Sequence, residues 1–136
     1  MSGTRRKART IALKTLYEVD SANRVATQVV ERYLAEEDLS EENGTFIREL
    51  VCGVIDNKTA IDEKINKFAP AWPVDQLACI DRNVLRLAIF EILFDNKVPV
   101  KVAVSEAVEL AKTFGSKNSA RFINGVLGTV STLTSR

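Results

Sequence analysis

Histidine is absent from this chain of 136 residues. The absence removes the commonest general base and the commonest metal ligand from any site that the protein could build. The two cysteines, Cys52 and Cys79, lie far apart in the chain and have no companion ligands, which argues against a zinc site. The sequence also lacks a phosphate-binding glycine loop and a serine in a nucleophile-elbow context. We therefore expect a protein that is not an enzyme and that uses no cofactor.

Long apolar runs are absent as well. No stretch approaches the roughly 18 apolar residues of a membrane span. Lys14, Glu18 and Asp20 interrupt any apolar segment that a signal peptide would need. Both cysteines stand in apolar surroundings, so we predict that they are small core residues in a reducing compartment. These features predict a cytoplasmic protein that does not contact a membrane.

Neither sign of charge is in large excess, but basic and acidic residues are segregated along the chain. The formal net charge is only +1, yet residues 1–14 hold five cations and no acid. The stretch from Glu31 to Glu49 holds seven carboxylates against two arginines. This separation indicates one anionic partner near the N-terminus instead of general binding to polyanions.

Helical periodicity dominates, and no convincing strand pattern occurs. We predict an all-α fold of about seven helices, arranged as two small helical bundles packed into one compact unit. A long helix is expected over residues 40–69, and the sequence PAWP that follows it ends the helix. We place the division there, between an N-terminal three-helix subdomain, residues 1–70, and a C-terminal four-helix subdomain, residues 71–136. The segment DRNVLRLAIFEILFDNK is apolar nearly all round and should run through the middle of the fold.

Local signals predict where helices begin and end. Ser40 is a plausible N-cap, Gly115 marks the end of the helix that starts after Pro99, and Ser116 can cap the last helix. The Asn124–Gly125 pair is read as helix because no strand pattern flanks it. The buried face of the last helix is expected to comprise Phe122, Ile123, Val126, Leu127, Val130 and Leu133.

Three groups of residues suggest function. The first is the basic start, with Arg5, Arg6 and Arg9 within about one helical turn, since guanidinium groups bind phosphate and stack on bases. A solubilising, frayed terminus is the alternative. Aromatic and polar residues make the second group: Phe114, Asn118 and Phe122 lie among the cations Lys112, Lys117 and Arg121. An aromatic beside cations can stack an unpaired base, although both phenylalanines could instead be core.

The third group comprises apolar residues away from a core face and charged residues within an apolar segment. Leu13 and Tyr17 lie off the core face of the first helix, which indicates a second surface to cover. Asp81 and Arg86 belong to the apolar central segment. Arg86 is either a buried, paired arginine or part of an interface, and the sequence leaves both readings open.

The stretches RRKARTIALKTLYEVD, VLRLAIFEIL and above all VPVKVAVSEAVELAKTFGSKNSARFINGVLG resemble the NusB family of bacterial transcription antitermination factors. The resemblance runs nearly end to end. It implies a non-enzymatic, all-helical adaptor that binds single-stranded boxA RNA of ribosomal RNA leader transcripts. It also implies a protein partner, NusE, and entry into the RNA polymerase elongation complex with other Nus factors, in support of ribosomal RNA synthesis and maturation.

The resemblance also implies roles for individual residues. Arg5, Arg6 and Arg9 take the place of the family's arginine-rich RNA-binding segment, and Phe114, Asn118 and Phe122 fall on its other RNA-contacting positions. Positions associated with the NusE surface are Tyr17, Asp81 and Arg86. Two departures stand out. Asn118 replaces a frequent aspartate and removes a negative charge near RNA, and Asp81 replaces a longer glutamate, so its partner contact is expected to be shorter or absent.

Two other functions stay open at this point. The chain could be a protein–protein adaptor without direct RNA binding, in which the cations contact acidic protein. It could also be an RNA-targeting domain like that of ribosomal RNA cytosine methyltransferases, and so either an independent factor or a fragment. Self-association as a homodimer, which would cover the arginines, is a further open point.

Overall fold

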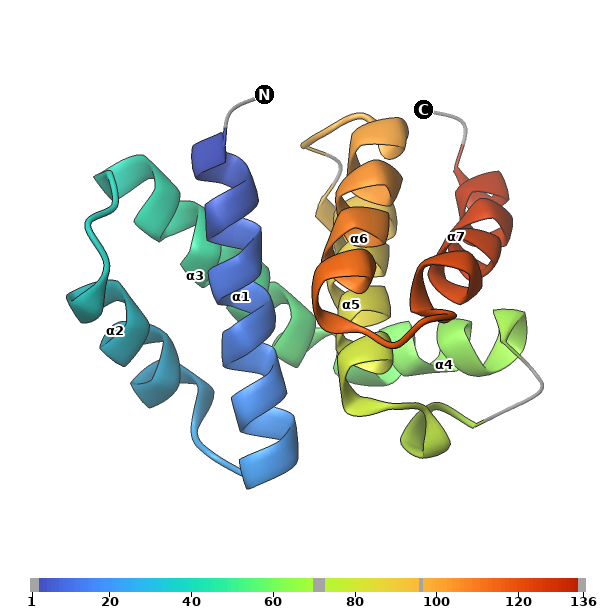
Figure 1. The fold of residues 1–136 in the computed structure, drawn as a ribbon, viewed down its shortest axis with the longest axis horizontal. Coiled ribbons are helices and arrows are strands. Elements are labelled where there is room, and N and C mark those ends of the chain that lie inside the picture. The colour runs from blue at the N-terminus through green and yellow to red at the C-terminus, as the bar shows by residue number, and fades with distance from the viewer. Residues whose placement is uncertain (1–2, 70–72, 96, 135–136) are drawn as a thin grey trace. The chain divides into compact units, whose positions relative to one another are not determined.

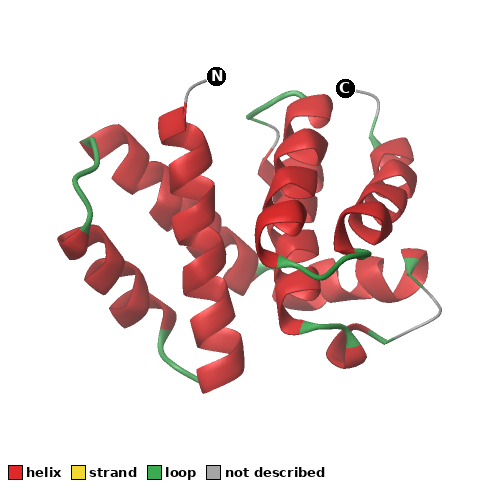
Figure 2. Ribbon diagram, viewed as in Figure 1, coloured by secondary structure: helices red, strands yellow, loops and turns green. Residues whose placement is uncertain are grey.

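The computed structural model describes residues 3–69, 73–95 and 97–134, and within these ranges it contains seven α-helices and no strand (Figures 1 and 2). The all-α prediction is therefore confirmed. The helices are α1 (Gly3–Ala22), α2 (Ala26–Glu36), α3 (Glu41–Asp56), α4 (Lys58–Phe68), α5 (Cys79–Ile89), α6 (Val100–Phe114) and α7 (Ser119–Val130). Three shorter helical turns accompany them: η1 (Val74–Gln76), η2 (Phe90–Asp95) and η3 (Ser131–Leu133).

The chain divides into two compact units, Met1–Asp56 and Asn57–Arg136. Helices α1 to α3 make the first unit, and α4 to α7 make the second. The contacts place α4 in the second unit because this helix packs against α5 and α7. Residues 70–72 of the PAWP segment lie outside the described residues. The predicted division into a three-helix subdomain, 1–70, and a four-helix subdomain, 71–136, stays a prediction.

The first unit forms because α1 buries one face against α2 and α3. Helix α1 buries Ala8, Ile11, Ala12, Thr15 and Leu16 on this face, and Val19 further along it is half-buried. Each large side chain of this kind contributes about 1.5–3 kcal/mol when it leaves water. Leu13, expected beside that face, is buried too, at 1% exposed. After α1 the chain turns at Asn23, whose φ of 56° lies in the left-handed region that asparagine tolerates.

Helix α3 begins as the sequence predicts. The Oγ of Ser40 accepts a hydrogen bond of 3.1 Å from the backbone N–H of Asn43, as an N-cap does. Glu41 and Glu42 follow in the first turn, where the helix dipole favours negative charge. The predicted single helix over 40–69 is nevertheless interrupted, since α3 ends at Asp56 and α4 starts at Lys58. Asp56 and Asn57, which occupy this point, are residue types with low helix propensity.

In the second unit, α5 is the central helix. It packs against α4, α6 and α7, and every residue from Asn83 to Ile89 is buried. The prediction for this segment is confirmed, and its continuation as the π-helical turn η2 was not foreseen. Two smaller expectations were wrong: Cys52 is exposed, and Leu133 is 45% exposed.

The turn between α6 and α7 depends on close packing at Gly115. A Cβ at this position would lie 2.5 Å from Oγ of Ser119 and 2.7 Å from the carbonyl oxygen of Ala111. The backbone φ of Gly115 is −91°, so glycine is needed here for space and not for a left-handed conformation. Ser119 is 2% exposed, and its Oγ accepts a 2.9 Å hydrogen bond from the backbone N–H of Ser116. The capping position of α7 is Asn118 and not Ser116.

Two identical substitutions should therefore have opposite effects on stability. We expect Gly115→Ala to lower the free energy of unfolding by about 1–3 kcal/mol, because the added methyl group overpacks the turn. Gly125→Ala is the matched control, since a Cβ there meets nothing within 4 Å. In the interior of α7 it should raise the free energy of unfolding by about 0.5–1 kcal/mol. Urea denaturation of the full chain measures both. A Gly115→Ala variant as stable as Gly125→Ala would contradict the packing argument.

Candidate nucleic-acid and protein interface

The basic start of the chain is helical. Helix α1 begins at Gly3, so Arg5, Arg6 and Arg9 project from its first two turns and not from a frayed terminus. No acidic residue stands in the first turn of α1. Cations at the amino end of a helix are unfavourable, because the helix dipole already makes that end partly positive. Some other interaction has to offset this charge.

Phe46 and Asn43 of α3 supply that interaction. The guanidinium carbon of Arg5 lies over the Phe46 ring, 4.0 Å from its centroid, and that of Arg9 lies 5.3 Å from the same centroid. Nη1 of Arg5 also donates a 3.0 Å hydrogen bond to Oδ1 of Asn43. The negative face of an aromatic ring attracts cations at these distances. One ring and one amide oxygen therefore compensate two of the clustered charges.

The three arginines differ in exposure. Arg6 is exposed, Arg5 is half-buried, and Arg9 is only 1% exposed. In this structure Arg5 and Arg6 can present N–H groups to a partner in solution. A direct contact by Arg9 would require its guanidinium to leave its buried position. The prediction that all three bind RNA stays a prediction, and the structure separates them into two presented groups and one that packs inward.

The acidic stretch pairs with cations of the same unit. Lys7 lies 3.1 Å from a carboxylate oxygen of Glu37. Glu31 accepts two hydrogen bonds from Arg48, at 2.7 and 2.9 Å, and these bonds hold the pKa of Glu31 below its usual value. Hydrogen bonds from Arg32 likewise lower the pKa of Glu18. Acidic groups of the first unit are thus held as charged partners of its arginines, so the acidic stretch is only in part a free negative surface.

The turn between α6 and α7 gathers the second predicted group. Phe114 is the last residue of α6, Asn118 precedes the first residue of α7, and Phe122 lies one helical turn further on. Both phenylalanines are half-buried, so neither is a full core residue. Asn118 is exposed and its side chain makes no capping hydrogen bond. The surrounding cations Lys112, Lys117 and Arg121 are all exposed.

The residues predicted to contact a protein partner have different surroundings. Tyr17 is 41% exposed on α1 and is available to a partner. Asp81 stands in the first turn of α5, and its Oδ1 is buried without a hydrogen-bond partner in the part of the chain that the structure describes.

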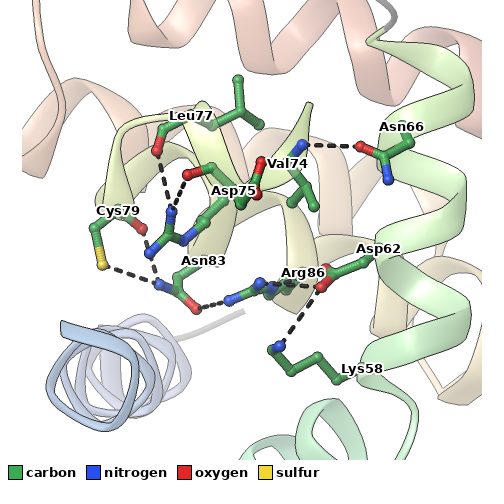
Figure 3. A network of polar contacts seen from close by, with 10 residues as sticks. Lys58, Asp62, Asn66, Val74, Asp75, Leu77, Cys79, Asn83 and Arg86 are labelled. Carbon is green, nitrogen blue, oxygen red and sulfur yellow. Dashed lines mark hydrogen bonds and ion pairs between the residues drawn. The ribbon is translucent and has the colours of Figure 1, made fainter. Parts of the chain in front are cut away.

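Arg86 is buried and paired (Figure 3). Its Nε and Nη2 donate to the two carboxylate oxygens of Asp62, at 2.9 and 3.1 Å, and its Nη1 donates to Oδ1 of Asn83 at 3.2 Å. Asn83 in turn donates to the carbonyl oxygen of Cys79 at 2.9 Å. Of the two readings that the sequence leaves open for Arg86, the structure shows the buried, paired arginine. Its role towards a partner stays a prediction.

A groove of about 520 Å³ lies on the second unit between α6 and α7, and Lys112 is one of its lining residues. Its walls include Val100, Val104 and Val108 of α6 and Asn124 and Gly128 of α7. None of the nine predicted site residues lines it. Among the described residues, no group of three or more histidine, cysteine or acidic side chains is placed to hold a metal ion. No helix in the described ranges has the length and apolar character required to cross a membrane.

The residues that sequence reasoning missed are Asn43, Phe46 and Asp62. Phe46 carries a core pattern, and its contact with arginines depends on which residue of α3 faces the start of α1. Asp62 is one acid among many on amphipathic helices, and nothing in its spacing marks it as the partner of Arg86. The one available signal for Asp62 was Arg86 itself, because a lone arginine in an apolar helix needs an acidic partner.

The chain is similar to known proteins along nearly its whole length. A sequence model described as the NusB family matches residues 6–132. Two similar proteins are the transcription antitermination proteins NusB of Dehalococcoides mccartyi and Chloroflexus aggregans. The first is 57% identical over 96% of this chain and 92% of its own length, and the second is 47% identical over 97% and 89%.

Solved structures have the same fold. The NusB of T. maritima superposes with a TM-score of 0.89 at 30% identity, over 97% of this chain and 93% of that chain. A chain from a crystal structure of the antitermination factors NusB and NusE in complex with dsRNA gives a TM-score of 0.89 at 24% identity, over 98% of this chain and 100% of that chain. At that identity the second likeness is one of fold.

The network around Arg86 makes a direct prediction about stability. Asp62→Ala should lower the free energy of unfolding by about 3–5 kcal/mol, because it leaves the buried guanidinium of Arg86 without its carboxylate. Glu63→Ala is the control on the same helix, where the side chain is exposed and the change should stay within about 0.5 kcal/mol. Denaturant unfolding measures both variants. Equal effects of the two substitutions would show that the pair does not stabilise the fold.

Proposed function

This chain belongs to the NusB family, and on that premise we propose that it is a transcription antitermination factor that binds boxA RNA of ribosomal RNA leader transcripts together with NusE. One observation carries the proposal: a protein 57% identical over 96% of this chain is named transcription antitermination protein NusB. The proposal includes entry into the RNA polymerase elongation complex and support of ribosomal RNA synthesis and maturation. The site of action is the cytoplasm, where transcripts emerge.

The geometry of the first unit supports RNA binding. Arg6 is exposed and Arg5 is half-buried on a helix that is already formed, and the forked N–H groups of arginine suit phosphate oxygens. We assign the direct phosphate contacts to Arg5 and Arg6. The proposal for Arg9 is that it reinforces the cluster from its buried position and reaches RNA only when that position opens.

In the second unit, the turn between α6 and α7 is the proposed site of base contacts. Half-buried Phe114 and Phe122 offer ring surface for stacking, and exposed Lys112, Lys117 and Arg121 attract the backbone. The exposed amide of Asn118 can both donate to and accept from a base edge, and as a neutral group it does not repel phosphate. Phosphate contacts position the strand, so sequence preference has to come from this turn and from NusE.

NusE is the proposed protein partner, and Tyr17 is its proposed anchor. A tyrosine that is 41% exposed offers apolar area and a hydroxyl group, a combination enriched at interface centres. Asp81 remains a proposed contact at the start of α5. For Arg86 we propose an indirect role, in which its bonds to Asp62 and Asn83 stabilise the amino-terminal half of α5. A solved structure with this fold contains the antitermination factors NusB and NusE in complex with dsRNA, which supports NusE as a partner.

Two rival functions have distinct signatures. A protein–protein adaptor would bind NusE but not RNA. An RNA-targeting domain of a methyltransferase would bind ribosomal RNA without NusE, and the names of the relatives favour the antitermination factor over it. A homodimer that covers the arginines would compete with RNA, so dilution of the protein would raise its apparent RNA affinity.

The salt dependence of RNA binding tests the arginine contacts. If three or four phosphates are neutralised, log affinity should fall against log salt with a slope of about −2 to −3 for single-stranded RNA. Arg6→Ala should weaken binding about three- to tenfold and make the slope shallower by about 0.7. Lys14→Ala is the control, an exposed cation of α1 outside the cluster, and should leave both values nearly unchanged.

Titration of boxA RNA and a scrambled RNA, with and without NusE, provides these measurements. Binding that does not depend on salt would contradict the phosphate contacts. The absence of binding to boxA RNA even with NusE present would contradict the proposed function itself.

The Tyr17 anchor is tested by NusE binding. Tyr17→Ala should weaken the affinity for NusE about tenfold, as loss of an aromatic anchor at an interface does. Val25→Ala removes another exposed apolar side chain of the first unit, 57% exposed, and should change the affinity less than about twofold. Calorimetric titration with purified NusE measures both variants. Equal affinities for Tyr17→Ala and the unmodified chain would place the NusE surface elsewhere.

A further inference from the structure

Phe46 is a buried aromatic residue in contact with the proposed RNA-binding arginines. Its ring both fills the core and interacts with their cationic groups. It is 6% exposed on α3 and lies under the guanidinium of Arg5, with the guanidinium of Arg9 close by. Other buried apolar residues of α3, such as Ile47 and Leu50, are aliphatic and have no π face to offer a cation. A leucine at position 46 would fill most of the same volume. The ring adds a negative face that only an aromatic residue provides.

Asn43 acts on the same arginine from a different direction. It is buried at 7% exposed, and its Oδ1 accepts a hydrogen bond from Nη1 of Arg5. Its backbone N–H is itself bound by Ser40, so the start of α3 is fixed where the amide meets the guanidinium. A buried amide oxygen that accepts from a cation is oriented by that bond. The planar guanidinium of Arg5 thus contacts the Phe46 ring with its face and the Asn43 amide oxygen with one edge.

Arg5 keeps binding capacity in this arrangement. A guanidinium group has five N–H donors, and the bond to Asn43 uses one of them. The side chain is half-exposed, so part of the group faces solvent. An arginine whose rotamer is already fixed loses less conformational freedom when it binds phosphate than a mobile one does.

We propose that Phe46 and Asn43 are positioning residues for RNA binding: they hold the Arg5 guanidinium, with Arg9 behind it, in the orientation in which it meets the phosphate backbone. This inference rests on the proposed function, because it concerns the same RNA. In this proposal the N-terminal cation cluster is ordered before RNA binds. Neither residue touches the RNA in this proposal.

Phe46→Leu and Phe46→Tyr test the ring directly. Phe46→Leu removes the π face and retains apolar bulk, so RNA affinity should fall about fivefold. The slope of log affinity against log salt should become shallower by up to about 0.7, because the Arg5 guanidinium is no longer held towards the phosphates. Phe46→Tyr retains the π face and should restore most of the affinity. Phe90→Leu is the matched control, since Phe90 is similarly buried at 7% but belongs to the second unit. It should change RNA affinity less than about twofold.

A readout on the free protein separates positioning from stability. The ring current of Phe46 should shift the Nε–Hε and Cδ–H signals of Arg5 in the NMR spectrum of the full chain without RNA. We expect this shift in the unmodified chain and in Phe46→Tyr, and its loss in Phe46→Leu. Asn43→Ala should reduce the shift and weaken RNA binding in the same direction, while circular dichroism shows that all variants remain folded at the assay temperature.

The outcomes are distinct. If Phe46→Leu loses the ring-current shift but binds RNA with unchanged affinity and slope, the inference is overturned. It is overturned as well if Phe90→Leu weakens binding as much as Phe46→Leu, or if the unmodified chain shows no shift at Arg5. Failure of the unmodified chain to bind boxA RNA with NusE present would instead remove the proposed function, and the free-protein spectrum would then still report whether Phe46 orders Arg5.

Discussion

The contact of Phe46 with Arg5 and Arg9 reconciles two demands on helix α1. The helix has to bury one face against α2 and α3, and it also carries three arginines at an end where the helix dipole is already positive. An apolar partner alone would leave that repulsion in place. The ring face and the Oδ1 of Asn43 offset part of that repulsion. Arg5 and Arg6 therefore stay accessible to solvent at least in part, whereas Arg9 is buried.

The acidic residues of the first unit have a complementary effect. Glu18, Glu31 and Glu37 pair with cations other than the three arginines, namely Arg32, Arg48 and Lys7. Exposed pairs of this kind contribute little to stability. Their effect is on the distribution of charge, because they set acidic groups of the first unit against cations outside the Arg5, Arg6 and Arg9 cluster. A net charge of +1 is then compatible with a local site for RNA.

The helices were predictable because apolar spacing along the chain reports a buried face, as in the uninterrupted burial of Val84 to Ile89. The N-cap at Ser40 was predictable for a local reason as well, since the cap bond spans three residues. What could not be predicted depends on contacts between distant segments. The pairing of Arg86 with Asp62 and the place of Phe46 under Arg5 join residues on different helices. The spacing of residues in the sequence does not report such pairs. For the same reason the sequence did not show that Arg9 is buried.

The central claim is that RNA binds at an arginine cluster that is ordered in advance and at the turn between α6 and α7. Side-chain and backbone NMR signals followed during titration with boxA RNA test it most directly. The account predicts that the Nε–Hε signals of Arg5 and Arg6 and the amide signals of residues 116–122 shift on binding, while the signal of buried Arg86 stays in place. Binding that leaves the Arg5 and Arg6 signals unmoved would contradict the account.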